Sequence, residues 1–368
     1  MISNVEYMQH AIRLAKKGLY STDPNPCVGC VIVKDEKIVG EGWHRRAGEA
    51  HAEINALEQA GDNARGATAY VTLEPCSHTG KTPPCADALI VAGVKKVIAA
   101  MRDPNPLVAG EGLEKLRAAG IEVESGLLEA QARDLNPGFI TRMELGRPFV
   151  RIKMAMSLDG RTAMASGESQ WISGAASRRD VQRMRAESSA ILTGIDTILA
   201  DDPSMNVRLD AEELGLDANL DVRQPKRIVL DSQFRMPAQA KIFSVEGECI
   251  VYTTVNMDAK SGYPFIIETC DSQDGKIDLR LLMDELAKKE INLLHVEAGS
   301  VLCGALLKND LVDEIIIYMA PHIMGDEAKG LFHLPGLEKM KDRILLNIKD
   351  VRAIGSDIRI TACPQIMQ

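Results

Sequence analysis

Residues 51–53 have the sequence His-Ala-Glu, and residues 75–85 have the sequence Pro-Cys-Ser-His-Thr-Gly-Lys-Thr-Pro-Pro-Cys. These segments supply one imidazole, from His51, and two thiols, from Cys76 and Cys85. One nitrogen and two sulfur donors suit a catalytic Zn²⁺, because three protein ligands leave the fourth tetrahedral position for water. Zinc lowers the pKa of such a water toward ~7, so hydroxide would be available at neutral pH to attack a ring carbon that carries an amino group.

A carboxylate stands beside the expected metal. Glu53 follows His51 by two residues and would carry a proton from the water to a ring nitrogen and then to the leaving ammonia. The helix expected to start at Cys85 would favour the thiolate of that residue. The alternative is a structural zinc site that only stabilises the fold. Such a site needs a fourth protein ligand, and Glu53 would then have no role in it. His78, inside the loop, could be mistaken for a zinc ligand; we take His51, Cys76 and Cys85 as the ligands, which leaves His78 to shape the pocket or contact the substrate.

The other six cysteines are interpreted as buried thiols. Cys27 and Cys30 have the Cys-x-x-Cys spacing of redox and zinc sites, but residues 31–33 predict a strand, whose alternation places the two side chains on opposite faces. Without a secretion signal, a disulfide framework is not expected. Free cysteine is among the most buried residue types, and the remaining four lie among apolar residues: Cys249, Cys270, Cys303 and Cys363.

The composition is that of an ordinary globular chain. Its 368 residues predict two domains, with 45% hydrophobic and 26% charged residues. A formal net charge of −9 and an aromatic content of 4% argue against a nucleic-acid partner, because phosphate binding needs basic residues and base stacking needs aromatic ones. No apolar run approaches ~18 residues, and the N-terminus shows no secretion signal. We therefore expect a cytoplasmic protein with no membrane partner.

Strands alternate with helices along the chain, which predicts layered α/β domains. The segment Gly146-Arg147-Pro148 marks the expected boundary between a first domain, residues 1–146, and a second, residues 147–368. In the first domain we expect helices at 4–17, 51–60, after Pro83-Pro84 and at 111–119, and strands at 28–33, 38–42, 68–73, 95–101 and 121–125. In the second we expect strands at 149–156, 189–193, 227–231, 249–254, 292–296 and 313–319, and helices at 175–187, 278–289 and 299–308.

The two opening segments match the first part of the zinc deaminase signature, His-x-Glu followed by Pro-Cys-x-x-Cys, but eight residues separate Cys76 and Cys85 instead of two. Those segments, with Asp23-Pro24-Asn25-Pro26, Val28-Gly29 and Gly42-Trp43-His44, resemble the deaminase half of the bifunctional riboflavin-biosynthesis deaminase/reductase family. The resemblance implies a cytidine-deaminase-like α/β/α domain. It also implies hydrolytic deamination of 2,5-diamino-6-(5-phosphoribosylamino)pyrimidin-4-one, a phosphorylated small molecule.

The same resemblance implies that Asn25, His44 and Lys81 hold this substrate. Taken alone, Asn25 between two prolines would be a turn residue, and Lys81 beside a glycine would be a solvated charge.

The second half has no Gly-x-Gly-x-x-Gly after a strand, so a standard dinucleotide site is not indicated. Three segments nevertheless resemble the reductase half of the same family: RIKMAMSLDG at 151–160, TGIDTILADDP at 193–203 and HVEAGS at 295–300. The resemblance implies a dihydrofolate-reductase-like α/β domain that uses NADPH to reduce the ribosylamino group to a ribitylamino group.

The resemblance also assigns the reductase residues. Lys153 and Asp201 would be catalytic, because the nitrogen needs a proton or a positive partner when hydride adds to the ring-opened sugar. Substrate contacts would come from four side chains, of which the arginines suit a phosphate: Ser169, Arg185, Arg208 and Glu297. Cofactor contacts would come from Ala155, Trp171, Thr197, Asp201, Ser232, Gly299, Ser300, Val301, Leu302, Cys303, Gly304 and Ala305.

Purely structural roles for these residues also stay open. Gly299 lies where a strand turns into a helix, whose backbone N–H groups can hold a phosphate. Taken alone, Gly299 and Gly304 would be turn and packing residues, and any one arginine on a helix would be solvated.

Two other functions also stay open. One is a nucleoside or tRNA deaminase with an unrelated C-terminal domain, which the long spacing between the cysteines and the acidic net charge disfavour. The other is a non-enzymatic zinc protein whose second half is a binding module. A homo-oligomer formed through an exposed strand edge of the second domain is compatible with the sequence.

Overall fold

The computed structural model describes residues 3–77, 84–106, 109–256 and 262–365. The chain divides into two compact units, which are treated separately below. The first unit comprises residues 1–146 and 211–221, and the second comprises residues 147–210 and 222–368. The division falls inside the expected boundary segment, and no sequence pattern predicts that 211–221 belongs with the first unit. None of the described helices combines the length and the apolar character needed to cross a membrane.

A five-stranded sheet forms the centre of the first unit, with the strand order β2-β1-β3-β4-β5. β1 pairs antiparallel with β2 and β3, and β3, β4 and β5 run parallel. The strands are β1 (Gly29–Lys34), β2 (Lys37–Trp43), β3 (Thr68–Val71), β4 (Lys96–Ala99) and β5 (Glu122–Ser125). The helices are α1 (Asn4–Ala15), α2 (Ala52–Ala60), α3 (Cys85–Val91), α4 (Glu111–Ala118), α5 (Glu129–Arg133) and α6 (Pro137–Leu145).

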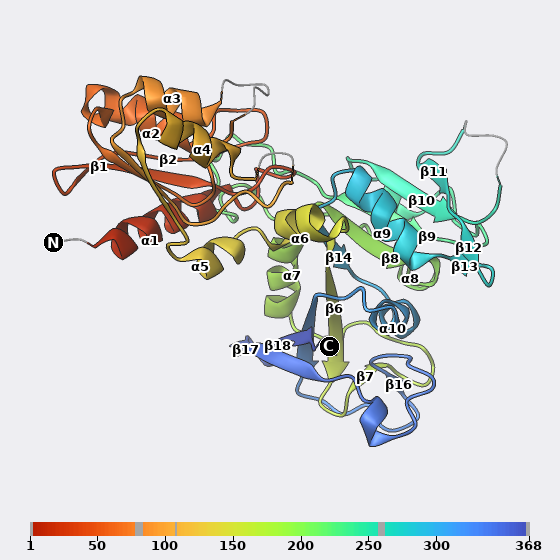
Figure 1. The fold of residues 1–368 in the computed structure, drawn as a ribbon. Helices are drawn as coiled ribbons and strands as arrows, with labels where there is room; N and C mark the ends of the chain where they lie inside the picture. Colours follow the sequence, from red (N-terminus) through yellow and green to blue (C-terminus); the bar gives the residue numbers. More distant parts are fainter. Residues whose placement is uncertain (1–2, 78–83, 107–108, 257–261, 366–368) are drawn as a thin grey trace. The chain divides into compact units, whose positions relative to one another are not determined.

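Helices cover both faces of this sheet, as the first unit in Figure 1 shows. On one face α2, α3 and α4 pack on Cys30 and Ile32 of β1; on the other, α1, α5 and α6 pack on Val31, Val33 and Cys27. Cys27 and Cys30 thus lie in separate apolar clusters on opposite sides, which confirms the prediction that they do not form one Cys-x-x-Cys site. The predicted α/β/α layering is also confirmed.

The second unit contains a nine-stranded sheet, with the order β11-β10-β9-β8-β14-β6-β15-β18-β17. Seven strands run parallel, and the last two form an antiparallel hairpin at one edge. The strands are β6 (Phe149–Ser157), β8 (Ala190–Gly194), β9 (Lys226–Leu230), β10 (Cys249–Thr253), β11 (Ile266–Thr269), β14 (Leu293–Val296), β15 (Glu314–Ala320), β17 (Leu346–Ile354) and β18 (Asp357–Pro364). Two short pairs join β7 (Arg161–Ala163) to β16 (Lys329–Gly330) and β12 (Ser272–Gln273) to β13 (Lys276–Ile277).

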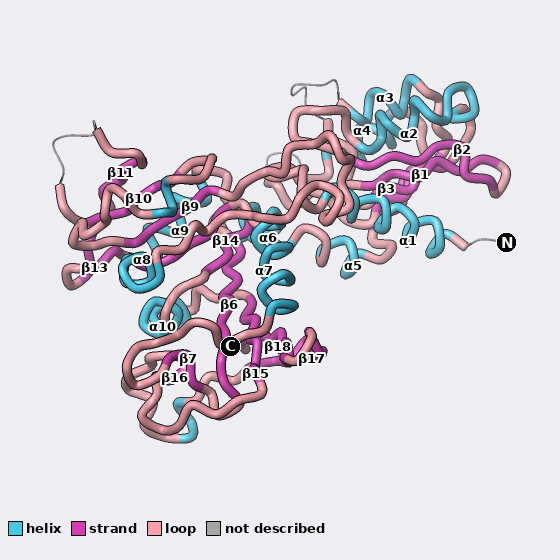
Figure 2. The backbone as a smooth tube through the Cα atoms, turned by 180° about the vertical axis from the view of Figure 1, so that it is seen from behind, coloured by secondary structure: helices cyan, strands magenta, loops and turns pink. Residues whose placement is uncertain are grey.

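The helices of this unit also occupy two layers (Figure 2). α9 (Leu279–Lys288) and α10 (Ser300–Lys308) pack on one face of the sheet in its largest apolar cluster. On the opposite face lie α7 (Ala175–Glu187), which packs on β15, and α8 (Ile195–Asp201). A polar helix such as α7 can cover a sheet only if its charged side chains find partners there.

Most expected elements appear within a few residues of their predicted bounds, and the helix expected at 4–17 ends at Ala15 and continues as the 3₁₀ turn Lys16–Gly18. Three further 3₁₀ turns are Gly61–Ala64, Lys241–Phe243 and Met340–Asp342. The sequence predicted neither α5, α6 and α8 nor the short strands β7, β11, β12, β13 and β16, and it did not predict the hairpin β17–β18. In β17 apolar and polar residues alternate only in two short stretches, because the register shifts between Ile348 and Asp350.

Candidate active sites

The three expected zinc ligands converge in the first unit. His51 is the N-cap residue of α2, Cys76 follows β3, and Cys85 begins α3. His51 Nδ1 lies 3.2 Å from Cys85 Sγ and 3.7 Å from Cys76 Sγ, and the three donor atoms lie within 4.8 Å of one another. No fourth His, Cys, Asp or Glu donor joins them in the described part of the chain, and His78 lies outside it. This donor set fits a tetrahedral Zn²⁺ with one open position.

The N-terminus of α3 contacts Cys76. The backbone N–H of Cys85 donates to Cys76 Sγ at 3.3 Å, and the N–H of Ala86 donates to the Cys76 carbonyl oxygen. A hydrogen bond from the Cys85 thiol lowers the pKa of Cys76 to about 4, and the same bond, together with burial, raises the pKa of Cys85. The expectation that the helix favours the Cys85 thiolate stays a prediction, and the structure adds that the first amide of α3 points at the sulfur of the preceding ligand.

Glu53 lies in the first turn of α2, where only 3% of the residue is exposed. Burial and then the nearby Cys76 raise the pKa of Glu53 to about 7. A carboxyl group with such a pKa both accepts and releases a proton near neutral pH.

Asn25 and His44 form a pair next to the zinc ligands. Asn25 Nδ2 lies 3.1 Å from His44 Nε2, and His44 Nδ1 lies 3.1 Å from the Ala50 carbonyl oxygen. Burial lowers the pKa of His44, so Nδ1 donates and Nε2 accepts from the amide. The His44 and His51 rings meet edge to face, with centroids 5.3 Å apart. The sequence-predicted Lys81 lies outside the described residues.

A second polar cluster occupies the second unit. Arg185, on α7, donates from Nε and Nη2 to the two carboxylate oxygens of Glu297 at 2.6 Å and 2.9 Å, and from Nη1 to the Asn206 carbonyl oxygen at 2.9 Å. Lys153, on β6, is half-buried beside this ion pair; burial lowers its pKa, and Glu297 acts in the opposite direction. The structure thus brings together three of the predicted reductase residues.

Comparisons with known proteins agree with this arrangement. The model "Cytidine and deoxycytidylate deaminase zinc-binding region" matches residues 1–101, and the model "RibD C-terminal domain" matches residues 148–360. The Escherichia coli (strain K12) riboflavin biosynthesis protein RibD is 52% identical over 96% of this chain and 97% of that protein. The chain belongs to the RibD family.

Solved RibD structures share the whole fold. Form 1 of Acinetobacter baumannii RibD has a TM-score of 0.90 and 48% identity over 98% of this chain and 99% of that one. A Thermotoga maritima diaminohydroxyphosphoribosylaminopyrimidine deaminase/5-amino-6-(5-phosphoribosylamino)uracil reductase has a TM-score of 0.86 and 35% identity over 98% of both chains. As a RibD-family protein, this chain is a bifunctional enzyme with a zinc-dependent deaminase domain and an NADPH-dependent reductase domain. The RibD C-terminal match also disfavours the alternative of a nucleoside or tRNA deaminase with an unrelated second domain.

The expected cofactor residues of the RibD C-terminal unit differ in how far they are buried. At the start of α10, Gly299 and Val301 are exposed, and the space where a Gly299 Cβ would lie is open, so a phosphate-bearing group can approach the first amides of the helix. Cys303 and Gly304 are buried instead, and a Cβ on Gly304 would lie 2.1 Å from the His333 carbonyl oxygen. Half-buried positions are Ser300, Leu302, Ala305, Ala155, Thr197 and Ser232.

The other predicted RibD reductase residues lie on exposed segments. Trp171 is 70% exposed, and the Arg178 guanidinium lies 4.7 Å from its ring centroid. Asp201, at the end of α8, accepts a hydrogen bond from Gln170. The backbone N–H of Arg208 donates to the Gln182 side chain of α7, and Ser169 is half-buried.

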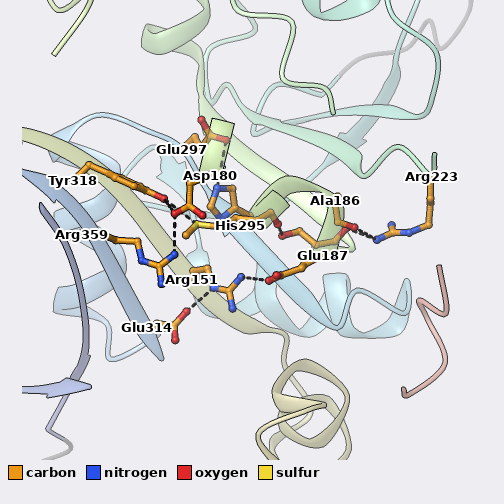
Figure 3. A network of polar contacts seen from close by, with 12 residues as sticks. Arg151, Asp180, Ala186, Glu187, Arg223, His295, Glu297, Glu314, Tyr318 and Arg359 are labelled. Carbon is orange, nitrogen blue, oxygen red and sulfur yellow. Dashed lines mark hydrogen bonds and ion pairs between the residues drawn. The ribbon is translucent and has the colours of Figure 1, made fainter. Parts of the chain in front are cut away.

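In this RibD-family protein, ion pairs fix α7 on the sheet, and Figure 3 shows them. Near the end of the helix, Arg151 of β6 bridges Glu187 and Glu314. Nearer its start, Asp180 accepts hydrogen bonds from Tyr318 at 2.6 Å and from Arg359 at 2.8 Å. α7 therefore carries Arg185 on a helix held at both sides of the Glu297 contact.

Sequence reasoning missed several polar groups that hold these RibD sites. Glu74, two residues before Cys76, is buried and accepts four backbone N–H bonds, from Asp103, Gly110, Gly112 and Leu113. These bonds replace an N-cap side chain for α4. His295 is fully buried, and its Nε2 lies 3.4 Å from Glu297 Oε1. An acidic residue directly before the Pro-Cys pair was the only available signal for Glu74.

Proposed function

We propose that the two domains act in succession on one phosphorylated pyrimidine. Residues 1–146 release a ring amino group of 2,5-diamino-6-(5-phosphoribosylamino)pyrimidin-4-one as ammonia. Residues 147–368 then reduce the ribosylamino side chain of the product to a ribitylamino chain with NADPH. The observation that carries the proposal is that the donor atoms of His51, Cys76 and Cys85 lie within 4.8 Å of one another, with the buried Glu53 two residues from His51.

In the deaminase, His51, Cys76 and Cys85 would hold zinc, which supplies a water of lowered pKa when bound. Glu53 takes a proton onto a carboxylate oxygen and delivers it first to a ring nitrogen and then to the departing amino group. A C–O bond forms and a C–N bond breaks, so one water is consumed and one ammonia leaves. Asn25, held by His44, orients the ring, and Lys81 is proposed as a further substrate contact.

In the reductase, NADPH when bound would supply a hydride for the ring-opened sugar carbon. Lys153 Nζ delivers a proton to the attached nitrogen, and its lowered pKa makes the ammonium a better acid. Glu297 contacts the sugar hydroxyls, and Arg185, Arg208 and Ser169 hold the phosphate end of the substrate.

The remaining proposed residues serve the cofactor. Asp201 assists proton transfer near the cofactor. The first turn of α10 supplies backbone N–H groups for a phosphate, from Gly299, Ser300, Val301 and Leu302, and the same helix contributes Cys303, Gly304 and Ala305. Further contacts are proposed for Ala155, Trp171, Thr197 and Ser232.

A coupled assay tests both halves in the full chain. With the diamino substrate, zinc and NADPH present, ammonia release and NADPH absorbance are followed together. Glu53→Gln should keep zinc and lower ammonia release by about 10²–10⁴-fold, the usual contribution of a general acid–base group. Glu58→Gln, on an exposed position of the same helix, should leave both steps unchanged. Ammonia release at the normal rate by the Glu53→Gln variant would refute the assigned role.

The reductase half needs the converse variant. Lys153→Ala should stop NADPH oxidation on the deaminated substrate and leave ammonia release intact, whereas Lys308→Ala, on the exposed end of α10, should change neither. Normal reduction by the Lys153→Ala variant would assign the proton transfer to another group.

We also propose a homo-oligomer formed through the second domain. β17 is a sheet edge that exposes 40% of Leu346, 66% of Ile348 and 57% of Val351, and unpaired edges with apolar side chains favour pairing with a second copy. Sedimentation of the Ile348→Asp variant against the unmodified chain tests this, since an unchanged mass would contradict it. A cytoplasmic location is proposed because reduced thiolates are needed for the zinc site.

A further inference from the structure

The segment with helices α5 and α6 lies between the two regions that the family models match, residues 1–101 and 148–360. Its place in the chain suggests a connector between two catalytic domains. In the structure, however, Ala132, Leu135 and Ile140 of this segment are buried in the cluster that α1 forms on one face of the first sheet. The segment is thus a full layer of the deaminase unit.

Asn136, the N-cap residue of α6, makes an unusual pair of hydrogen bonds. Its Oδ1 accepts the backbone N–H of Cys27 at 2.7 Å, and its Nδ2 donates to the Cys27 carbonyl oxygen at 2.9 Å. One side chain therefore satisfies both backbone groups of a residue that lies 109 positions away, as a neighbouring strand would. Only 9% of Asn136 is exposed, so these bonds are shielded from water.

Asn136 makes these bonds instead of capping the N-terminus of its own helix. Asparagine is among the best N-cap residues, because its side chain accepts a backbone N–H of the first helical turn. In α6 the Asn136 side chain makes no such bond, and Pro137, which has no N–H, occupies the start of the helix. The amide is committed to Cys27 instead of to its own helix.

Cys27 lies in the segment that presents Asn25. Asn25 contacts His44, and the backbone N–H of His44 donates to the Val28 carbonyl oxygen at 2.9 Å. Residues on both sides of Cys27 are therefore tied to His44, whose ring packs against the zinc ligand His51. A shift of the Cys27 backbone would move Asn25 relative to the metal.

We propose that Asn136 is a positioning residue of the deaminase, which holds the Cys27 backbone so that Asn25 is oriented for the substrate. The α5–α6 segment is then part of the deaminase active site and not a connector. This inference rests on the proposed substrate contact of Asn25. Removal of the amide leaves the zinc ligands in place, so the effect falls on substrate binding.

The test compares Asn136→Ala with Asn4→Ala in the full chain. Asn4, on α1, accepts a 2.6 Å hydrogen bond from Tyr70, whose ring lies in the same apolar cluster, so Asn4→Ala controls for the loss of a side-chain hydrogen bond elsewhere in this layer. Asn136→Ala should raise the deaminase KM by about 10–100-fold, the scale expected for a misplaced binding group, with a smaller change in kcat. Zinc content and the reductase rate should stay unchanged.

Hydrogen exchange of the peptide that contains residues 22–28 gives a readout independent of turnover. Exchange should be faster in Asn136→Ala and unchanged in Asn4→Ala. The Asn136→Asp variant keeps the acceptor for the Cys27 N–H, so that amide should exchange more slowly than in Asn136→Ala. If the alanine variant does not fold, the aspartate variant can still be compared with the unmodified chain.

Two results overturn the inference: normal exchange of 22–28 in Asn136→Ala, or a KM equal to that of Asn4→Ala. Failure of the proposed Asn25 contact is distinguishable, because Asn25→Ala would then leave the KM unchanged while exchange still responds to Asn136→Ala.

Discussion

The ion pair between Arg185 and Glu297 is the part of the second unit whose loss should be most costly. Arg185 is 8% exposed and the Glu297 side chain 13%, and the two groups share a bidentate contact. Burial alone would raise the pKa of Glu297, but the Arg185 guanidinium outweighs it and holds that pKa well below its usual range. Glu297→Leu would leave a buried guanidinium with one carbonyl partner, and Arg185→Met would leave a buried carboxylate.

The magnitude follows from this burial. Removal of one partner from a buried pair costs about 3–5 kcal/mol, because the remaining charge stays desolvated and unpaired. For a unit of roughly 200 residues, each kcal/mol lowers Tm by about 2–4 °C, so each single variant should lower it by about 6–20 °C. The double variant Arg185→Met/Glu297→Leu removes both charges at similar volume and should recover most of this loss.

Calorimetry of the full chain measures the Tm of the two single variants and of the double variant. Added zinc should raise the transition of the first unit only, which identifies the second transition as that of the reductase unit. Single variants that cost less than about 1 kcal/mol, the value of an exposed pair, would refute the reasoning, and so would a double variant whose loss equals the sum of the singles.

Three further predictions concern single side chains. A hydrogen bond from the Ser157 hydroxyl, and then bonds from the backbone N–H groups of the facing loop, lower the pKa of Asp159 to about 2. The stabilisation that ionised Asp159 contributes is therefore present above pH 3.8 and is lost as the pH falls toward 2. Asp159→Asn should remove this pH dependence, so the Tm of the second unit should fall less steeply at acid pH. A Cβ on Gly112 would lie 1.9 Å from the Pro75 carbonyl oxygen, so Gly112→Ala should lower ammonia release and zinc content while the rate of NADPH oxidation is unchanged. Asp357 accepts bonds from the first turn of α7, so Asp357→Ala should destabilise the second unit by about 1–2 kcal/mol in urea unfolding, and an unchanged midpoint would contradict this role.

Local sequence patterns predicted much of the fold and the metal site. The apolar run at 31–33 predicted a strand there, whose alternating faces separate Cys27 from Cys30, and the spacing of donors at 51–53 and 75–85 selected three ligands. The polar groups that hold these sites carry no such pattern. Nothing near Asn136 or Asp357 in the sequence indicates their partners, because one hydrogen bond between distant segments leaves no periodic trace. The hairpin β17–β18 was not predicted because a register shift between Ile348 and Asp350 interrupts the apolar alternation of β17.

The sequence by itself determined the donor types and the order of strands and helices, because ligand chemistry and side-chain periodicity are local properties. Only the tertiary structure decided which cysteine faces the first amide of α3 and that Lys153 lies half-buried beside the Arg185–Glu297 pair. It also decided that residues 127–145 form a layer of the deaminase unit. Those facts depend on burial and on close approach between segments distant in sequence, and both arise only once the layers have packed.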